Sequence, residues 1–215
     1  MSGFRIVYED DHIIVADKPA GMLVIPTPKG ESNTLTSLLN RELDARGIEA
    51  NAHPCHRLDR ETSGLIIYAK GKKTQQAMME EFRQHRVRKT YIAFVHGRLA
   101  RKAGTIDLPI EGKRSVTKYR VTEERRDFSV VEIEPETGRT NQIRIHFKSI
   151  GHPLVGERKF AFAKDYKLKF RRAALHSQNI GFTHPVTGEQ LVFTAPVPED
   201  MAKFLETNGQ KGGTA

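Results

Sequence analysis

The chain has 215 residues and a formal net charge of +9, and 38% of its residues are hydrophobic. This apolar content is enough for a core and excludes a wholly disordered chain. No apolar run approaches the ~20 residues needed to cross a bilayer, which excludes an integral membrane protein and predicts no membrane partner.

The first half of the chain predicts alternating strands and helices. Residues 13–15 are typical of a strand, and the sequence DKPAG that follows is typical of a turn. Thr34 is a predicted N-cap for a helix that ends near Gly47. Four leucines at helical spacing share one face of this helix: Leu35, Leu38, Leu39 and Leu43.

The next elements surround a central apolar run. Residues 65–69 are continuously apolar and predict a buried strand. Thr74 is a predicted cap for a second helix, on which Met78 and Phe82 face inward. Two more strands are expected, over residues 91–95 and 130–133.

The sequence NQIRIHF, residues 141–147, alternates between apolar and polar side chains. A period of two predicts a strand with Ile143, Ile145 and Phe147 on one face, so that Arg144 points away from the core. The segment LVFTAPVPEDM predicts a last strand and a short helix. Because no Pro/Ser-rich linker divides the chain, we expect a single domain over residues 1–205, followed by a disordered tail over residues 206–215.

The cysteine count and the N-terminal sequence indicate the cellular compartment. Cys55 is the only cysteine, so the chain has no internal disulfide, and the N-terminus shows no signal-peptide pattern. These features predict a cytoplasmic protein.

The positive charge is concentrated in the middle of the chain. Residues 1–69 contain 7 basic and 10 acidic side chains, residues 70–120 contain 14 and 4, and residues 121–215 contain 14 and 12. Such a concentrated field suits a polyanion, although a solvated surface is the alternative. A second cluster could bind phosphates and bases or form one face of a surface element. Its members are Lys164, Tyr166, Lys167, Lys169, Phe170, Arg171 and Arg172.

The segment HPCHRLDRETSGLIIYAK offers the strongest candidate for chemistry. Asp59 lies between Arg57 and Arg60, just before the predicted buried strand, and flanking arginines favour an ionised carboxylate that acts as nucleophile or base. The alternative is that Asp59 only caps a turn and pairs with an arginine. A zinc site at His53, Cys55 and His56 is poorly supported, because no second ligand pair follows at metal-site spacing. A Cys55–His56 nucleophile pair is equally weak, because sequence neighbours seldom face each other productively.

The sequence HRLDRETSGLIIYAK resembles the signature of the RluA family of RNA pseudouridine synthases, which reads HRLDxxTSGxxxxAK. Further blocks resemble other motifs of that family and occur in its order, from about residue 6 to 200. They are DDHIIVADKPAGMLV, RKTYIAFVHG, TGRTNQIRIHF, GHPLVGERKF and LHSQNIGFTHPVTGEQLVFTAPVPEDM.

The resemblance implies a role for four residues. Asp59 matches the catalytic aspartate, Tyr91 the tyrosine that stacks on the target base, and Arg144 the arginine that pairs with the catalytic carboxylate. Arg57 matches the arginine that fills the space left by the extruded uridine. Asn141 stands where the family usually has His, and no role is assigned to it.

The resemblance also implies the fold and the reaction. It implies an α+β protein with a mixed, largely antiparallel sheet, flanking helices and a basic central cleft. The reaction breaks the N-glycosidic bond, turns the base and rejoins it through carbon 5, which requires a flipped-out nucleotide. Asp59 would attack the anomeric carbon or remove the neighbouring sugar proton, and both routes stay open. The basic region would supply phosphate contacts from Lys72, Lys73, Arg86 and Arg88.

The motifs also indicate which cofactors and macromolecular partners to expect. The sequence contains no glycine-rich phosphate loop and no zinc spacing, so we expect no metal, no nucleotide and no other cofactor. The expected partner is ribosomal RNA, transfer RNA or both, bound by a monomer that lacks the S4-like N-terminal domain of some relatives. The alternatives are a non-catalytic RNA-binding or ribosome-assembly protein of this fold, and a hydrolase with Asp59 as general acid. The flanking arginines disfavour the hydrolase, because they favour the carboxylate form.

Overall fold

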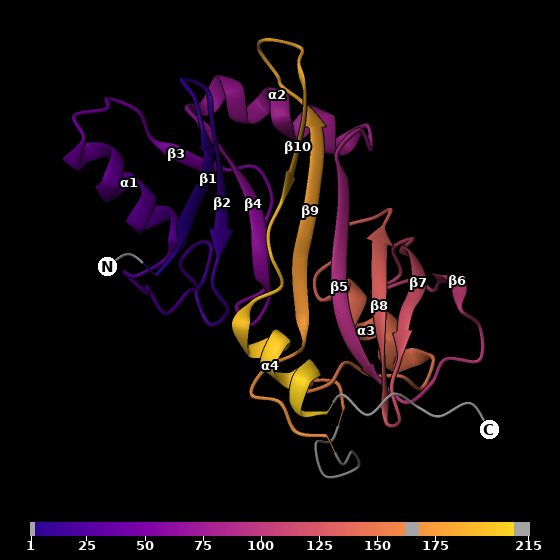
Figure 1. Ribbon diagram of the computed structural model, residues 1–215. Helices are drawn as coiled ribbons and strands as arrows, with labels where there is room; N and C mark the ends of the chain where they lie inside the picture. The colour runs from indigo at the N-terminus through magenta and orange to yellow at the C-terminus, as the bar shows by residue number, and fades with distance from the viewer. Residues whose placement is uncertain (1–2, 162–167, 209–215) are drawn as a thin grey trace. The chain divides into compact units, whose positions relative to one another are not determined.

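The computed structural model describes residues 3–161 and 168–208, which fall into two compact units (Figure 1). The first unit lies within residues 1–89 and 177–195, and the second within residues 90–176 and 196–215. Among the described residues, no helix has the length and apolar content that crossing a membrane requires. The expectation of a single domain over residues 1–205 stays a prediction.

The first unit is built on a sheet in which β2 and β4 are central. Its strand order is β1-β2-β4-β9, with β3 beside β4 and β10 beside β9. The pairs β1–β2, β2–β4, β3–β4 and β9–β10 are antiparallel. The strands are β1 (Arg5–Glu9), β2 (Ile13–Lys18), β3 (Ala52–Pro54), β4 (Ser63–Lys70), β9 (Leu175–Thr183) and β10 (Gln190–Thr194).

Helix α1 (Leu35–Ala45) begins where the sequence predicts. The Thr34 hydroxyl accepts the N–H of Ser37 at 3.2 Å, and the Ser37 hydroxyl accepts the N–H of Thr34 at 2.9 Å, which forms a capping box. Leu35, Leu39 and Leu43 are buried, whereas Leu38 is half-buried. The predicted cap and apolar face are confirmed.

Helix α2 (Lys72–Arg83) begins three residues earlier than expected. Gly71, with φ 98°, turns the chain directly after β4 ends at Lys70, so Gly71 is the N-cap and Thr74 is a buried residue of the first turn. The predicted Thr74 cap is therefore wrong. Met78 is buried among the apolar residues of β2 and β4, and Phe82 packs against the same cluster, as predicted.

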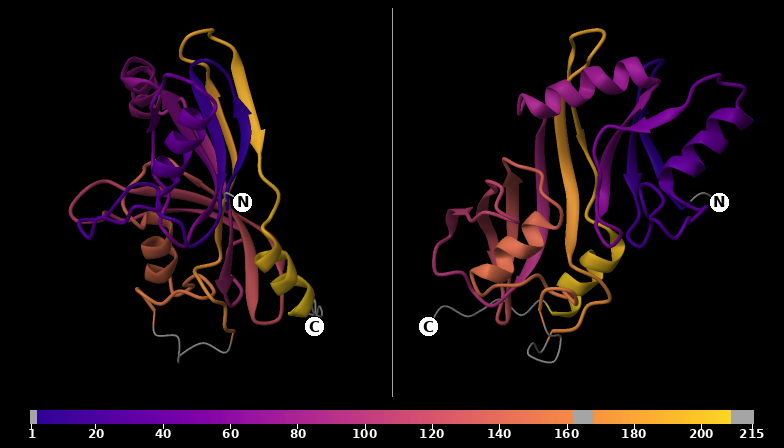
Figure 2. Two further views of the ribbon diagram at one scale, coloured as in Figure 1. Left: turned by 90° about the vertical axis from the view of Figure 1, so that its left-hand side faces the viewer. Right: turned by 180° about the vertical axis from the view of Figure 1, so that it is seen from behind.

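The second unit has a four-stranded antiparallel sheet with a helix on each face. Its order is β5-β8-β7-β6, and Figure 2 shows α3 and α4 on opposite faces of these strands. Ile92 and Phe94 pack with Met201 and Phe204 of α4 on one face. The elements are β5 (Arg88–His96), β6 (Ala103–Asp107), β7 (Val116–Glu124), β8 (Phe128–Pro135), α3 (Gln142–Ser149) and α4 (Glu199–Thr207).

Residues 142–149 form helix α3, so the strand predicted over residues 141–147 is wrong. The polar residues Gln142 and His146 are four apart on the helix and are both buried against β7. Gln142 Nε2 donates to the Val116 carbonyl at 2.9 Å, and His146 Nδ1 lies 2.9 Å from Thr117 Oγ1. Because β7 supplies these partners, polar and apolar side chains are buried together, and the alternating pattern does not mark a solvent face.

The α+β class with a mostly antiparallel sheet is confirmed. The short strands expected over residues 13–15, 65–69, 91–95 and 130–133 lie within β2, β4, β5 and β8, and the last strand and helix are β10 and α4. Helix α4 continues to Thr207, beyond the expected start of the tail at residue 206. The remainder of that tail, from residue 209, lies outside the described residues, as do Lys164, Tyr166 and Lys167 of the second basic cluster.

Candidate active site

Asp59 lies in the loop between β3 and β4 of the first unit. Its backbone carbonyl accepts the N–H of Thr62 at 3.1 Å, which closes a turn just before β4. Leu58 is buried and anchors the loop, whereas Arg57 is exposed and Asp59 is half-buried. The loop therefore presents an acidic and a basic side chain from a backbone that is fixed on both sides.

His56 continues the pairing of β3 with β4 through its side chain. The backbone N–H of Cys55 donates to the Ile67 carbonyl at 2.9 Å, and the N–H of Ile67 donates to His56 Nε2 at 3.0 Å. Burial, reinforced by the nearby charge of Lys89, lowers the pKa of His56 to about 3. The imidazole thus stays neutral and accepts a hydrogen bond that the next backbone carbonyl of a strand would accept. Because the His56 side chain takes the place of a backbone carbonyl, the backbone can leave the sheet at the loop that contains Asp59.

The buried ammonium of Lys18 fixes the other end of the loop. Lys18 is 0% exposed, and its Nζ donates to the carbonyls of Met22 at 2.8 Å, Pro19 at 3.0 Å and Arg60 at 3.3 Å. Gly21 and Arg60 are joined as well, because the Gly21 N–H donates to the Arg60 carbonyl at 2.8 Å and Arg60 Nε donates to the Gly21 carbonyl at 3.0 Å. The DKPAG turn therefore holds the loop beside Asp59.

Tyr91 lies on β5 of the second unit and is 7% exposed. It stands opposite Ile133 of β8, which in turn stands opposite Tyr119 of β7. Side chains directly opposite one another in antiparallel strands point to the same face. The Tyr119 ring contacts Phe147 of α3, with ring centroids 5.6 Å apart. Tyr91 is thus on the sheet face that α3 covers.

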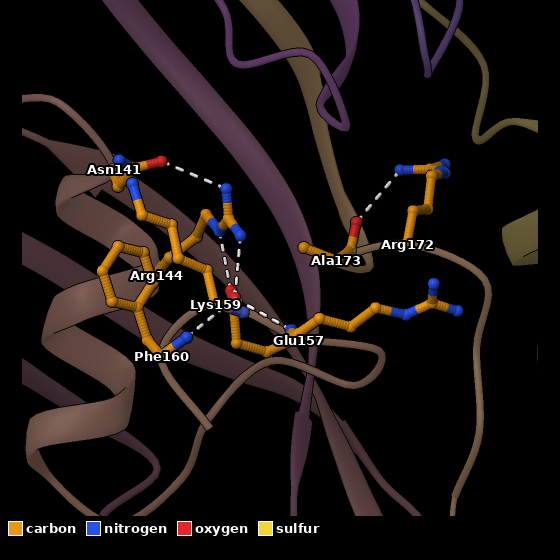
Figure 3. Close-up of polar contacts among 8 residues, drawn as sticks. Asn141, Arg144, Glu157, Lys159, Phe160, Arg172 and Ala173 are labelled. Atoms are coloured by element: carbon orange, nitrogen blue, oxygen red, sulfur yellow. Dashed lines mark hydrogen bonds and ion pairs between the residues drawn. The ribbon is translucent and has the colours of Figure 1, made fainter. Parts of the chain in front are cut away.

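Arg144 projects from α3 into a buried ion pair with Glu157 (Figure 3). Arg144 Nε donates to Glu157 Oε2 at 2.6 Å, and Nη2 donates to Oε1 at 2.7 Å. Burial alone would raise the pKa of Glu157, but the hydrogen bonds from Arg144 and from the Lys159 and Phe160 N–H groups lower it. The pair is thus ionised and fixes the plane of the guanidinium.

The predicted catalytic residues come from both units. Asp59 and Arg57 belong to one loop of the first unit, whereas Tyr91 and Arg144 belong to the second unit. Within the second unit, Tyr91 and the helix of Arg144 share one face of the sheet. The pairing of Arg144 with Asp59 stays a prediction.

The predicted RNA-binding residues of the first unit differ in their surroundings. Lys72 and Lys73 are exposed in the first turn of α2, and Arg88 is exposed at the start of β5. Arg86 is also exposed, but its Nε donates to Glu81 Oε2 at 2.9 Å. An ion pair with an acidic neighbour offsets part of the positive charge at Arg86, so the two lysines are the stronger candidates for phosphate contacts.

Arg172, a member of the second basic cluster, is buried and not a surface cation. Its Nε and Nη2 donate to the two carboxylate oxygens of Asp200 at 2.7 and 3.0 Å, and its guanidinium lies 5.5 Å from the Phe170 ring centroid. This pair attaches α4 to the segment before β9. Among the described residues, no group of three or more His, Cys, Asp or Glu side chains could hold a metal ion.

Comparisons with known proteins identify the family. Residues 12–149 match the family model described as RNA pseudouridylate synthase. The chain is 40% identical to "Uncharacterized RNA pseudouridine synthase YlyB" of Bacillus subtilis over 225 aligned residues, covering 97% of this chain and 73% of that protein. The chain belongs to the RluA family of RNA pseudouridine synthases. Members of this family are isomerases.

Other RluA-family relatives extend the comparison. The chain is 36% identical to "Ribosomal large subunit pseudouridine synthase D" of Zymomonas mobilis, with 92% of this chain and 70% of that protein covered. Among solved structures, "Human RNA Pseudouridylate Synthase Domain Containing 4" matches with a TM-score of 0.79 at 22% identity, covering 97% of this chain and 94% of that chain. This likeness confirms the pseudouridine synthase fold.

Sequence reasoning missed three residues that shape the candidate site of this RluA-family chain. Lys18, His56 and Glu157 all lie in segments that resemble family motifs: DKPAG, HRLD and GHPLVGERKF. The signal that could have found them is a polar residue to which no catalytic role is assigned, inside a motif-like segment. Their hydrogen-bond partners lie on other segments of the chain, so only the folded structure shows what each one holds.

Proposed function

We propose that this chain isomerises specific uridines to pseudouridine in structured RNA, with Asp59 as the nucleophile or base. The observation that supports the proposal most directly is the Asp59 loop, a carboxylate beside the exposed Arg57 on a backbone held by His56 and Lys18. Such a fixed loop is what an attack on a ribose carbon requires, because the reacting atoms must meet in one geometry.

Each of the other residues has a place in this proposal. Arg144 keeps Asp59 charged and oriented, and Tyr91 offers a ring face to the uracil and a phenolic oxygen as a candidate acceptor for the carbon-5 proton. Arg57 fills the space that the flipped uridine leaves, and Lys72 and Lys73 contact phosphates. The substrates are ribosomal RNA, transfer RNA or both. The name of the Zymomonas relative, a ribosomal large subunit pseudouridine synthase, agrees with ribosomal RNA.

The proposal is tested by a tritium-release assay. RNA labelled at carbon 5 of uridine is prepared as unmodified large-subunit ribosomal RNA and as unmodified transfer RNA, and pseudouridine is mapped in each. We expect the wild type to release tritium from at least one RNA and Asp59→Asn to release none. Asp44→Asn, which changes an exposed aspartate on α1, is the matched control and should keep full activity.

The outcomes separate the alternatives. Pseudouridine formed by Asp59→Asn would refute the nucleophile assignment, and binding without modification of either RNA would favour the non-catalytic protein. Release of free uracil would favour a hydrolase. Deuterium at ribose carbon 2′ slows the reaction only if Asp59 removes that proton, which distinguishes the two routes.

A further inference from the structure

Arg144 is held on two sides by residues that no motif role covers. Glu157 accepts hydrogen bonds from Nε and Nη2, and Asn141 Oδ1 accepts one from Nη1 at 3.1 Å (Figure 3). These contacts engage three of the five N–H donors of the guanidinium. The side chains of Arg144 and Glu157 are only 7% and 1% exposed, so solvent does not compete for these bonds.

Glu157 is itself fixed by the backbone around it. Its Oε1 accepts the N–H groups of Arg158, Lys159 and Phe160 at 3.0, 2.8 and 3.2 Å. Gly156, with φ 79°, lets the chain approach closely, because a Cβ there would lie 2.0 Å from the Arg172 carbonyl oxygen. The position of the carboxylate is therefore fixed by the backbone, and the carboxylate in turn fixes the position of the guanidinium.

Asn141 combines this contact with an unusual backbone conformation. It is the N-cap of α3 with φ 55° and ψ 22°, the left-handed region in which Asn, Asp and His are enriched over other non-glycine residues. The position therefore requires a side chain that tolerates this region and can accept a hydrogen bond. Both Asn and His satisfy these two conditions, which explains why Asn can stand at this position.

We propose that Glu157 and Asn141 are positioning residues that fix the guanidinium of Arg144 for its contact with the catalytic carboxylate. The inference rests on the proposed function, in which Arg144 orients Asp59. The physical reason is that a buried bidentate pair with no net charge fixes orientation more than it adds stability. The pairing with Asp59 would use N–H donors other than the three held by Glu157 and Asn141.

Variants of Glu157 test its part of the inference through the rate of the chemical step. Glu157→Gln places an amide NH₂ against N–H donors, so we expect kcat to fall about 100-fold, as for a misplacement of about 1 Å. KM should stay within about threefold of the wild-type value, because phosphate contacts elsewhere bind the RNA. Glu157→Asp keeps the charge but withdraws the carboxylate by one methylene, so its kcat should lie between those of the wild type and Glu157→Gln.

A double-mutant cycle distinguishes positioning from packing. If Glu157 acts through Arg144, then Glu157→Gln should add almost nothing to the loss caused by Arg144→Lys. Asp200→Asn is the matched control, because it breaks another bidentate arginine–carboxylate pair of the second unit, that of the buried Arg172. It should lower stability and leave kcat within about twofold. Additive losses, or equal losses of kcat in Glu157→Gln and Asp200→Asn, would overturn the role of Glu157.

Two substitutions at position 141 test the second residue. Asn141→Gly keeps the left-handed backbone and removes the acceptor, so we expect about a tenfold loss of kcat, which equals about 1.4 kcal/mol. Asn141→His should stay within about threefold of the wild type, because His tolerates the same conformation and a ring nitrogen can accept. Unchanged kcat in Asn141→Gly would remove Asn141 from the proposal.

A measurement without RNA keeps this inference separate from the proposed function. In ¹⁵N NMR spectra, a guanidinium held at three nitrogens rotates slowly, so the Arg144 Nη signals should be distinct in the wild type and averaged in Glu157→Gln. Distinct signals in Glu157→Gln would contradict positioning by Glu157. An inactive wild type with this NMR difference would instead refute only the proposed function.

Discussion

At the scale of single residues, three polar side chains hold the candidate site in place, and each is either uncharged or bound to partners that offset its charge. His56 acts as an uncharged acceptor, Lys18 spreads its charge over three carbonyls, and Glu157 balances Arg144. Lys18 and Glu157 are buried and His56 is half-buried, and the hydrogen-bond partners of each group avoid the desolvation cost of a polar group left alone. Arg57, in the same loop as Asp59, is by contrast exposed.

The depressed pKa of His56 predicts a pH dependence of stability. In the unfolded chain His56 has its ordinary pKa of 6.5, and in the folded protein about 3. As pH falls from 6.5 towards 3, the unfolded state binds a proton that the folded state does not, so the free energy of unfolding decreases. Denaturant titrations at several pH values should show a shallower decrease for His56→Gln than for the wild type.

The contribution of His96 to the pH dependence of the free energy of unfolding serves as an internal control. Burial lowers the pKa of His96 to about 4, and this histidine remains in both proteins. Some decrease of stability with falling pH should therefore persist in His56→Gln. Identical curves for the two proteins would mean that His56 titrates alike in the folded and unfolded states, and its role as a neutral acceptor would be wrong.

At the scale of elements, close backbone contacts decide where strands and helices can pack. Gly64, at the start of β4, has φ 109°, and a Cβ there would lie 2.2 Å from the carbonyl oxygen of Ser177. The contact is between two strands of the first unit, β4 and β9, directly after the Asp59 loop. No side chain fits at this contact, so the close approach of the two backbones requires glycine at the end of the TSG sequence.

We expect Gly64→Ala to destabilise the first unit by much more than about 1 kcal/mol, the cost of an alanine where φ is positive. Gly188→Ala is the matched control, because Gly188 has φ 75° and no atom lies within 4 Å of its Cβ position. The difference between the two variants in denaturant titration measures the steric part alone. Equal losses of stability would show that β4 and β9 can separate without cost.

At the scale of the whole molecule, the positive charge available to a ligand depends on ion pairing as well as on the positions of the basic residues in the sequence. The basic region over residues 70–120 is partly neutralised, since Arg83 pairs with Glu80 and Arg86 with Glu81. Lys72 and Lys73 are exposed on the first turn of α2. We therefore expect the long-range attraction of RNA to depend more on the two lysines than the count of basic residues suggests.

The salt dependence of RNA binding measures this difference. Replacing Lys72 and Lys73 by Gln should weaken binding and reduce the log–log salt slope by up to about 0.7–0.9 for each lost phosphate contact. The control replaces Lys102 and Lys203 by Gln, which removes the same charge from residues paired with Glu124 and Glu199. A slope that changes equally in both double variants would show that only net charge matters.

The family, the α+β class and most of the elements can be predicted from local patterns in the sequence. Local signals suffice for these: the Thr34 cap, the leucine face of α1 and the continuous apolar run of β4 each depend on neighbours in the chain. The strand predicted over residues 141–147 is wrong because the six alternating residues 142–147 are too few to separate a strand from a helix, and the choice depends on partners in β7.

The contacts that hold the candidate catalytic groups could not be predicted from the sequence and appear only in the folded chain. The acceptor role of His56, the carbonyl contacts of Lys18 and the pairing of Arg144 with Glu157 join segments that are separate in the sequence. Burial makes each contact strong and specific, and burial is a property of the packed chain. The sequence shows which side chains are present, and the fold determines which of them can ionise, accept or be held in place.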